Sequence, residues 1–368
     1  MTQQTNIPTK VSGDLLTAIE FNNLNDVINF NSDYATTHID TLTTQVSDLS
    51  SRLKTIEDTD TSDIQVYNTE DLPTDLTNGT IVFDTSAEVP VYIKDGAWYR
   101  CSDAASIDTF TEVDMFIVMG QSNADGKGDI NNLDSQTGRS LEGLDRTGTI
   151  IHSSSIDGST KEYIEGTWAQ INPGVNTTAN VPNRFGPELG FSDTVKAIVD
   201  GGGNAKYDKP VAILKFAKGG TNLAVDWDNP DGDCYTAMIQ DIPNGKFDLG
   251  QANYKFNIRG MIWYQGESDG SPQSRADAYE ANLTAFFADV RARFNKPTLP
   301  IMICKVEWYN ATRPDYLDTV RVAQQAVADA DANIDIIDVA GYDRRDDVHL
   351  NAKGQYELGE AIAAQWNL

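Results

Sequence analysis

Apolar runs that alternate with helical patterns constrain the fold of this 368-residue chain more than any other feature of its sequence. From about residue 108 onward, short apolar segments have the length and composition of buried strands. They span residues 115–119, 211–216, 261–264, 301–306 and 334–339. Helical patterns lie between or after them, at residues 187–199, 276–294, 316–330 and 355–366. This alternation predicts an α/β domain over residues 108–368, with a parallel sheet covered by helices on both faces.

The part of the chain before this domain differs in composition and predicts two smaller regions. Residues 1–62 are polar and rich in Thr, Asp and Asn. Within them, apolar residues recur at spacings of three and four: Ile39, Leu42, Val46, Leu49, Leu53 and Ile56. This pattern predicts a short coiled coil for oligomerisation or attachment, or alternatively a single amphipathic helix on its own domain. Residues 63–107 hold short β-like runs separated by turn residues, which predict a small β connector module.

The charge balance excludes several classes of partner. Lys and Arg number 28 against 55 Asp and Glu, a formal net charge of −27, so nucleic acid and anionic membranes should be repelled. The three cysteines lie far apart, without the spacing of a disulfide framework or a zinc site. We expect no metal and no cofactor. We also expect a soluble protein, because no apolar run approaches the length of a membrane span. The N-terminus MTQQTNIPTK lacks the apolar core of a signal peptide, so we expect no secretion signal of its own.

Small polar residues follow several predicted strands, where parallel sheets form their sites. The segments are Gly120-Gln121-Ser122-Asn123, Lys218-Gly219-Gly220-Thr221-Asn222, Tyr264-Gln265-Gly266-Glu267-Ser268 and, before the last helix, Asp346-Asp347-Val348-His349. A serine, a histidine and carboxylates are therefore expected at one edge of the sheet. These residue types can together perform nucleophilic acyl transfer.

Among three histidines, His349 is the best candidate for a catalytic base, because His38 lies beside the heptad seam and His152 in a serine-rich stretch. Asp346 lies three residues before His349 and can reach back to hold the imidazole Nδ1–H, with Asp347 as the alternative partner. Such a base would activate the hydroxyl of a serine, which is otherwise a weak nucleophile.

Acyl transfer also requires fixed donors for the negative charge that develops on the attacked carbonyl oxygen. The backbone N–H groups of Ser122 and of Gly219 or Gly220 can supply them, because glycine lets the backbone approach closely. The side-chain amide of Gln265 is a possible third donor.

These segments, in this order, resemble those of the SGNH hydrolases, and within them the branch of sialate O-acetylesterases and acetylxylan esterases. The resemblance covers roughly residues 112–368 and rests on VMGQSNADG, RFGPELGF, KFAKGGTNL, GMIWYQGESDG, AYEANL, RVAQQAV and DDVHLNAKGQYELG. It implies a three-layer α/β/α, flavodoxin-like domain with Ser122 as nucleophile, His349 as base and Asp346 as its partner. It likewise implies oxyanion donors at Ser122, Gly219 or Gly220, and Gln265. The wider superfamily has asparagine where this chain has Gln265, which favours the carbohydrate esterase branch over a lipase.

Further residues near these segments are candidates for supporting the site or contacting substrate: Gln121, Asn123, Asn222, Glu267, Glu188 and Trp308. Glu267 could orient Gln265 or a nearby backbone group, or be a structural carboxylate. Glu188 could support the site from behind, although packing or capping is favoured. Trp263 and Tyr264 are expected in the core. Trp308, Tyr309 and Trp227 are expected in loops, where they could stack on sugars.

The function expected from these features is removal of acetyl groups from an O-acetylated polysaccharide. The polar opening, heptad seam and small β module resemble, at the level of architecture, a bacteriophage tail fibre or tailspike. That resemblance implies a homotrimer in the virion, attached to other tail proteins and acting outside the cell on a host surface polysaccharide. The alternatives are a secreted or cytoplasmic bacterial acetylxylan or sialate O-acetylesterase, and a tail protein that binds glycan without cleaving it.

Overall fold

The structure, a computed structural model, describes two parts of the chain. Four strands between residues 65 and 100 are described by their backbone. Residues 111–366 are described throughout, apart from residues 180, 229, 253 and 311 and the side chains of residues 240, 243, 247 and 251. The predicted heptad seam and the rest of residues 1–62 lie outside the described residues.

The first part is a small sheet in the order β1-β2-β3-β4. Its strands are β1 (Gln65–Tyr67), β2 (Ile81–Asp84), β3 (Val89–Lys94) and β4 (Ala97–Arg100). Strands β1 and β2 are parallel, and the other two pairings are antiparallel. The β-like runs predicted here therefore do form strands. The division into residues 1–62, 63–107 and 108–368 remains a prediction.

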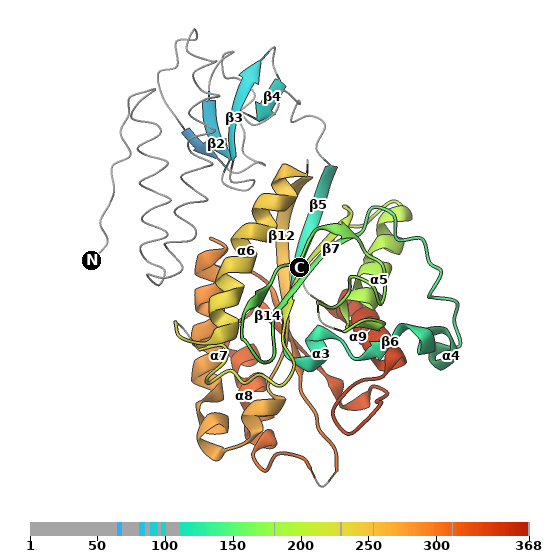
Figure 1. The fold of residues 1–368 in the computed structure, drawn as a ribbon, viewed down its shortest axis with the longest axis vertical. Coiled ribbons are helices and arrows are strands. Elements are labelled where there is room, and N and C mark those ends of the chain that lie inside the picture. The colour runs from blue at the N-terminus through green and yellow to red at the C-terminus, as the bar shows by residue number, and fades with distance from the viewer. Residues whose placement is uncertain are drawn as a thin grey trace, which may run out of the picture. The chain divides into compact units, whose positions relative to one another are not determined.

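The second part is built on a large sheet in the order β14-β13-β12-β5-β11-β7-β8, with β9 also paired to β7 (Figure 1). Its strands are β5 (Thr111–Gly120), β7 (Ile150–Ile156), β8 (Tyr163–Ile164), β9 (Ala169–Gln170), β11 (Val211–Ala217), β12 (Tyr254–Tyr264), β13 (Ile301–Lys305) and β14 (Ile334–Asp338). The pairings β14–β13, β13–β12, β5–β11 and β11–β7 are parallel, whereas β8 and β9 run antiparallel to β7. Short strands β6 (Gly128–Asp129) and β10 (Arg184–Phe185) form a separate pair.

Helices cover both faces of this sheet, which confirms the predicted three-layer α/β/α fold. Helices α5 (Glu188–Asp200) and α9 (Ala352–Gln365) pack together on one side, and α6 (Asp233–Gln251), α7 (Gln273–Arg293) and α8 (Leu317–Ala330) lie on the other (Figure 1). The shorter helical segments are α3 (Ser122–Asp125), η3 (Ile130–Asn132), α4 (Leu133–Thr137), η4 (Glu267–Gly270) and η5 (Val339–Gly341).

Two of the longer elements of the domain were not predicted from the sequence. Strand β7 has the sequence IIHSSSI. Its central histidine and serines break the apolar pattern by which a buried strand is predicted. Helix α6 contains a proline and two glycines, which are typical of loops rather than helix interiors. Both elements are nevertheless stabilised by packing in the fold, since His152 of β7 and Met238 of α6 are fully buried.

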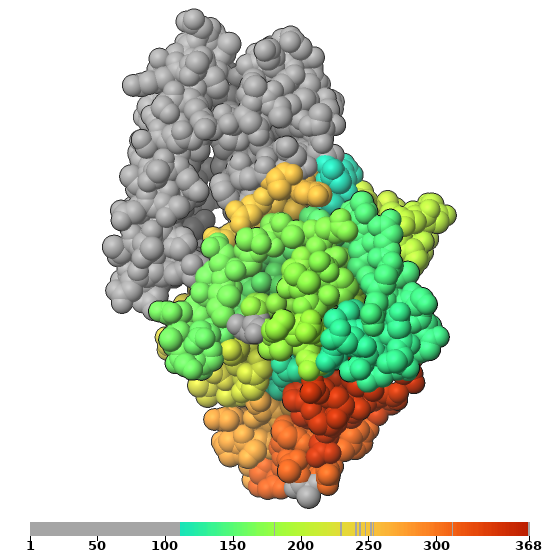
Figure 2. Space-filling view, turned by 45° about the vertical axis from the view of Figure 1, so that its right-hand side comes forward, coloured from blue at the N-terminus to red at the C-terminus, as the bar shows by residue number. Residues whose placement is uncertain are grey.

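Strand β5 is apolar on both of its faces because its residues 115–119 are fully buried in the core. On one side of the sheet, Phe116 of β5 meets Phe191 of α5 edge to face at 4.8 Å between ring centroids. In the layer of β12 and α7, Trp263 meets Phe286 at 4.8 Å. In Figure 2, the teal-green surface of the segment after β5 adjoins the red surface of the C-terminal residues. These two segments are joined by an ion pair between Arg139 and Glu360.

The carboxyl ends of β12, β5 and β11 are joined directly by backbone hydrogen bonds. The N–H of Gln121 donates to the Tyr264 carbonyl at 2.9 Å, and the N–H of Lys218 donates to the Gly120 carbonyl at 3.0 Å. Gly120 has a φ of 143°, and a Cβ built on it would lie 2.1 Å from the Tyr264 oxygen. Glycine is therefore required here, and it brings the three polar segments after these strands side by side.

We expect Gly120→Ala to lower the free energy of unfolding by about 3 kcal/mol or more, because the added Cβ overlaps backbone that cannot move without breaking the strand ends apart. Urea denaturation followed by circular dichroism measures this change. The control is Gly143→Ala, where a Cβ meets nothing within 4 Å and φ is not positive. The control should lie within about 0.5 kcal/mol of the unaltered protein. Equal stability of the two variants would contradict the steric argument.

Candidate active site

Ser122 lies at the carboxyl end of the central strand β5, as the first residue of the short helix α3. Its side chain is only 6% exposed. The turn that places it begins at Gly120 and is held by the Gln121–Tyr264 backbone bond described above. A serine hydroxyl is thus presented at the edge of the sheet.

His349 and Asp346 lie in the segment between η5 and α9, and they meet Ser122 from a sequence distance of more than 220 residues. The imidazole Nε2 is 3.0 Å from the Ser122 Oγ, and Nδ1 is 2.9 Å from Asp346 Oδ2. With its proton on Nδ1, the imidazole donates to the carboxylate, and Nε2 can accept the hydroxyl proton. This is the connectivity of a Ser–His–Asp triad.

Asp346 is held as a carboxylate by its surroundings. Its Oδ1 accepts from the backbone N–H groups of His349 at 2.7 Å and Val348 at 3.0 Å. Partial burial acts to raise the pKa of Asp346, but the hydrogen bonds from the His349 backbone and ring outweigh it, so this pKa lies below its usual value. Asp346 is therefore ionised at neutral pH and can stabilise an imidazolium.

The alternative partner, Asp347, points elsewhere. Its carboxylate oxygens lie 3.3 and 3.4 Å from the side-chain amide of Asn310, and its carbonyl accepts from the N–H of Tyr309. The geometry therefore favours Asp346 over Asp347 as the histidine's partner.

The loop after β11 supplies backbone donors beside the serine. A Cβ built on Gly219 would lie 3.2 Å from the Ser122 Cβ, and Gly220 has a φ of 79°. Among the hydrogen bonds of the described residues, none is donated by the backbone N–H of Ser122, Gly219 or Gly220. These groups are therefore available as oxyanion donors, and their assignment to that role stays a prediction.

Gln265 does not occupy the third donor position predicted for it. Its side chain is fully buried, and its amide Nε2 lies 2.6 Å from Asp269 Oδ2 and 3.1 Å from the Thr221 carbonyl. Its Oε1 accepts from the hydroxyl of Tyr279 at 3.1 Å. Because a primary amide has two N–H groups, both are already used. Gln265 instead ties the segment after β12 to the loop that carries Gly219.

Asp269 belongs to this arrangement and was not singled out from the sequence. It is fully buried and accepts from the backbone N–H groups of Leu223 and Ala224 as well as from Gln265. Burial raises the pKa of Asp269 to about 6. Its only signal in the sequence is a second acidic residue in the glycine-bounded turn GESDG.

The other supporting candidates lie around the triad in different environments. Asn123 and Glu267 are fully buried and bonded to each other, with Asn123 Nδ2 donating to Glu267 Oε1 at 2.9 Å. Gln121 Oε1 lies 3.5 Å from the Gly266 N–H. Asn222 donates to Asp226 at 2.8 Å through its side chain. These contacts within the protein favour support over substrate contact for Asn123, Glu267 and Asn222.

Glu188 begins α5 and pairs with Lys215 of β11 at 3.0 Å, both side chains being buried. It also accepts from the backbone N–H of Gly186 at 2.9 Å. Burial raises the pKa of Glu188, against the opposing charge of Lys215. This geometry agrees with the packing or capping role that the sequence favoured for Glu188.

The aromatic candidates for sugar stacking separate into two groups. Trp227 lies in a loop, as expected, but it is 1% exposed and packs against Trp263 and Phe216, so the expectation that it could stack on a sugar was wrong. Tyr309 is 43% exposed and lies over the Arg344 guanidinium. Trp308 is half-buried, and its indole N–H donates to Thr312. Trp263 and Tyr264 are fully buried, as predicted.

His152, the other histidine among the described residues, takes no part in this site. His152 of β7 is fully buried 3.6 Å from Asp241, and burial lowers its pKa to about 4. His38 lies outside the described residues. Within residues 111–366, no three His, Cys, Asp or Glu side chains are arranged to hold a metal ion. In the same part of the chain, no helix is long and apolar enough to cross a membrane.

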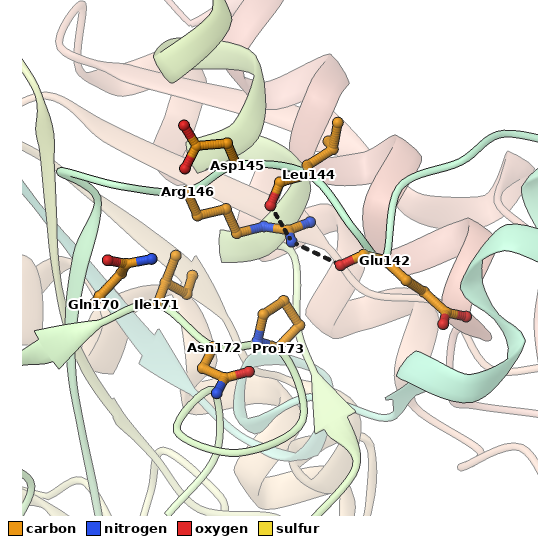
Figure 3. A pocket seen from close by; sticks show the side chains of 8 residues that line it. All are labelled: Glu142, Leu144, Asp145, Arg146, Gln170, Ile171, Asn172 and Pro173. Atoms are coloured by element: carbon orange, nitrogen blue, oxygen red, sulfur yellow. Dashed lines mark hydrogen bonds between the residues drawn. The ribbon is translucent and has the colours of Figure 1, made fainter.

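A separate pocket of about 400 Å³ lies away from the triad (Figure 3). It is lined by Glu142, Leu144, Asp145, Arg146, Gln170, Ile171, Asn172 and Pro173. Arg146 donates to the carbonyls of Glu142 and Leu144 and forms a buried ion pair with Asp193 of α5. The guanidinium is therefore used to hold the loop, and the pocket includes none of the three triad residues.

An α/β sheet that presents a hydrogen-bonded serine, histidine and aspartate at the ends of its strands defines the class of the serine hydrolases. A family described as "carbohydrate esterase, sialic acid-specific acetylesterase" matches residues 112–367. The chain belongs to this family, which confirms the resemblance predicted for the enzyme domain.

Individual relatives are distant. A probable carbohydrate esterase of Arabidopsis thaliana is 26% identical over 179 residues, which are 48% of this chain and 62% of the relative's length. A solved structure of an Arabidopsis thaliana protein is 22% identical and has a TM-score of 0.49, covering 68% of this chain and 96% of that one. A carbohydrate acetylesterase from Xanthomonas citri is 17% identical with a TM-score of 0.45, covering 75% and 59% respectively.

We expect Asp346→Asn to reduce kcat for p-nitrophenyl acetate by about 10⁴-fold, because the histidine loses the carboxylate that fixes its tautomer and stabilises its charge. The matched control is Asp347→Asn, one residue away, which should stay within about threefold of the unaltered protein. A large loss in the control together with a small loss in Asp346→Asn would reverse the assignment.

Proposed function

We propose that this protein is a serine O-acetylesterase that removes acetyl groups from a carbohydrate by two-step acyl transfer. The proposal is carried by the continuous hydrogen-bonded series from Ser122 Oγ through His349 to Asp346, with spacings of 3.0 and 2.9 Å. Membership of a carbohydrate esterase family supports the acetylated sugar as substrate.

In the first step, Ser122 Oγ attacks the acetyl carbonyl carbon while Nε2 of His349 accepts the hydroxyl proton. The resulting oxyanion lies against the backbone N–H groups of Ser122 and Gly219. Asp346 stabilises the imidazolium. Collapse of the intermediate breaks the bond to the sugar oxygen, which takes the proton from Nε2 and leaves as an alcohol.

In the second step, water attacks the acetyl-enzyme and gives a proton to Nε2 of His349. The second oxyanion uses the same backbone donors. Its collapse releases acetic acid, and Ser122 Oγ recovers the proton from the imidazolium. The cycle uses only groups of this chain and one water molecule.

We expect Ser122→Ala and His349→Ala each to lose several decades of kcat, and the double variant to lose little more, because triad members act as a unit. Acetate release and p-nitrophenyl acetate hydrolysis measure the loss, with circular dichroism as the check on folding. Ser135→Ala serves as the control, since Ser135 is an exposed serine that bonds only the Asn132 carbonyl. More than about a tenth of the activity remaining in Ser122→Ala would rule out the proposed nucleophile.

We further propose that the substrate is a host surface polysaccharide and that the chain is part of a bacteriophage tail fibre or spike. The support is the composition of residues 1–62 and their heptad seam. A bacterial acetylxylan or sialate O-acetylesterase is the rival enzyme, and a glycan-binding tail protein is the non-catalytic rival. Acetate release from acetylated bacterial polysaccharides, acetylated xylan and O-acetyl sialic acids separates these three.

If the tail assignment is correct, the full chain should be a homotrimer, and a chain lacking residues 1–105 should be a monomer that still hydrolyses p-nitrophenyl acetate. Both seam positions mix β-branched residues and leucine, which does not specify a dimer. Three sites on one stalk would bind a repetitive polysaccharide with high effective concentration. Light scattering on both chains measures the state, and a monomeric full-length chain would remove the main support for the tail assignment.

A further inference from the structure

The side chain of Asn123, the residue directly after the nucleophile, holds the backbone on both sides of the base. Its Nδ2 lies 3.2 Å from the carbonyl of Val348, and its Oδ1 accepts from the N–H of Leu350 at 3.1 Å. Val348 and Leu350 flank His349 in the chain. One amide therefore connects the turn that carries Ser122 with the segment that carries its base.

Among the side chains of this segment, that of Leu350 is fully buried, whereas those of the base and its partner are not. The His349 side chain is 25% exposed and that of Asp346 is 46% exposed. Arg344 also donates to the Val348 carbonyl, at 2.8 Å, and the N–H of Arg345 donates to the His349 carbonyl. Those bonds lie within the segment itself, however. Other bonds join the segment to neighbouring loops, since the Asp347 carbonyl accepts from the N–H of Tyr309 and Arg345 donates to the Lys127 carbonyl at 3.3 Å. The contacts of Asn123 differ from these because they come from the residue directly after the nucleophile.

Glu267 and Gln355 both favour one orientation of the Asn123 amide, and Glu267 makes the shorter contact: Gln355 Nε2 lies 3.4 Å from Asn123 Oδ1. The second hydrogen of Nδ2 is donated to Glu267 Oε1 at 2.9 Å, and Glu267 is fully buried in the turn after β12. An amide turned by 180° would place its oxygen against this carboxyl and its N–H₂ against the N–H of Leu350. Burial raises the pKa of Glu267 to about 7. A neutral carboxyl with its proton on Oε2 still accepts through Oε1.

We propose that Asn123 and Glu267 are positioning residues that act in series to hold His349 within hydrogen-bond distance of Ser122. Both side chains are fully buried, so neither touches substrate. They act on catalysis only through the backbone of residues 348–350. This inference rests on the proposed esterase mechanism and adds to it two residues outside the triad and the oxyanion donors.

The test compares Asn123→Ala, Glu267→Leu and Glu267→Gln with the unaltered full chain. Asn123→Ala should reduce kcat for p-nitrophenyl acetate about 100-fold, because misplacing a catalytic group by about 1 Å has effects of this size. Glu267→Leu should reduce kcat about tenfold, because the orienting acceptor is lost. Glu267→Gln retains an acceptor oxygen and should recover kcat to within about threefold. KM should change less than about threefold in all three variants.

Ser192→Ala is the control for a non-specific effect of losing a buried hydrogen bond. It removes a fully buried hydroxyl of α5 that donates to the Leu189 carbonyl. It should leave kcat unchanged. Thermal unfolding of every variant shows whether it is folded at the assay temperature. If Asn123→Ala does not fold, the comparison of Glu267→Leu with Glu267→Gln still decides, because both alter the same buried position.

The rate at which a fluorophosphonate labels Ser122 separates this inference from the proposed function. Labelling requires an activated serine but no sugar substrate. An unaltered protein that is labelled but releases no acetate from any ester would refute the esterase function and leave the positioning role open to measurement. Slower labelling of Asn123→Ala and Glu267→Leu, with recovery in Glu267→Gln, supports the inference. Equal labelling rates in all variants, or raised KM with unchanged kcat, would overturn it.

Discussion

The joined ends of β12, β5 and β11 are the feature on which the site depends. The two backbone bonds there, from Gln121 to Tyr264 and from Lys218 to Gly120, are possible only because Gly120 has no side chain to meet the Tyr264 oxygen. In a parallel sheet the loops after neighbouring strands share one edge, so functional groups from distant parts of the chain can meet there. In this domain, the two backbone bonds alone bring together three segments: the turn that carries Ser122, the glycine loop that carries Gly219 and Gly220, and the acidic turn that carries Glu267 and Asp269.

The acidic turn after β12 then connects the parts of the site through two buried carboxyl groups. Glu267 bonds Asn123, beside the nucleophile, whereas Asp269 bonds the backbone of Leu223 and Ala224, beyond the glycine loop. Burying such groups is costly, as their raised pKa values of about 7 and about 6 indicate. Apolar residues could fill the same volume but could not orient an amide or two N–H groups. We therefore infer that the two buried carboxyl groups of this turn lower the stability of the fold and, in return, hold the site in a defined geometry.

The sequence predicted the parts of this design that depend on local pattern. Strand β5 and helix α8 follow from apolar periodicity, and Ser122, His349 and Asp346 follow from residue chemistry at strand ends. It did not predict features set by tertiary packing. An indole in a polar loop looks exposed, yet Trp227 packs against Trp263 in the core. Gln265 looks like a free donor at a strand end, because nothing in its spacing shows that Asp269 and the Thr221 carbonyl occupy its amide.

Exposure increases along the triad, and in the proposed mechanism the two steps of the reaction depend on its two ends. Ser122 is 6% exposed above a fully buried Asn123, whereas the His349 side chain is 25% exposed. The buried end fixes the nucleophile against its backbone donors, which acylation requires. In the proposed mechanism, the more exposed end lies on the side from which water reaches the imidazole once the sugar has left, and deacylation requires that water. Asp346, at 46% exposure, interacts through a more polar medium, so its two backbone hydrogen bonds supply the orientation that burial does not.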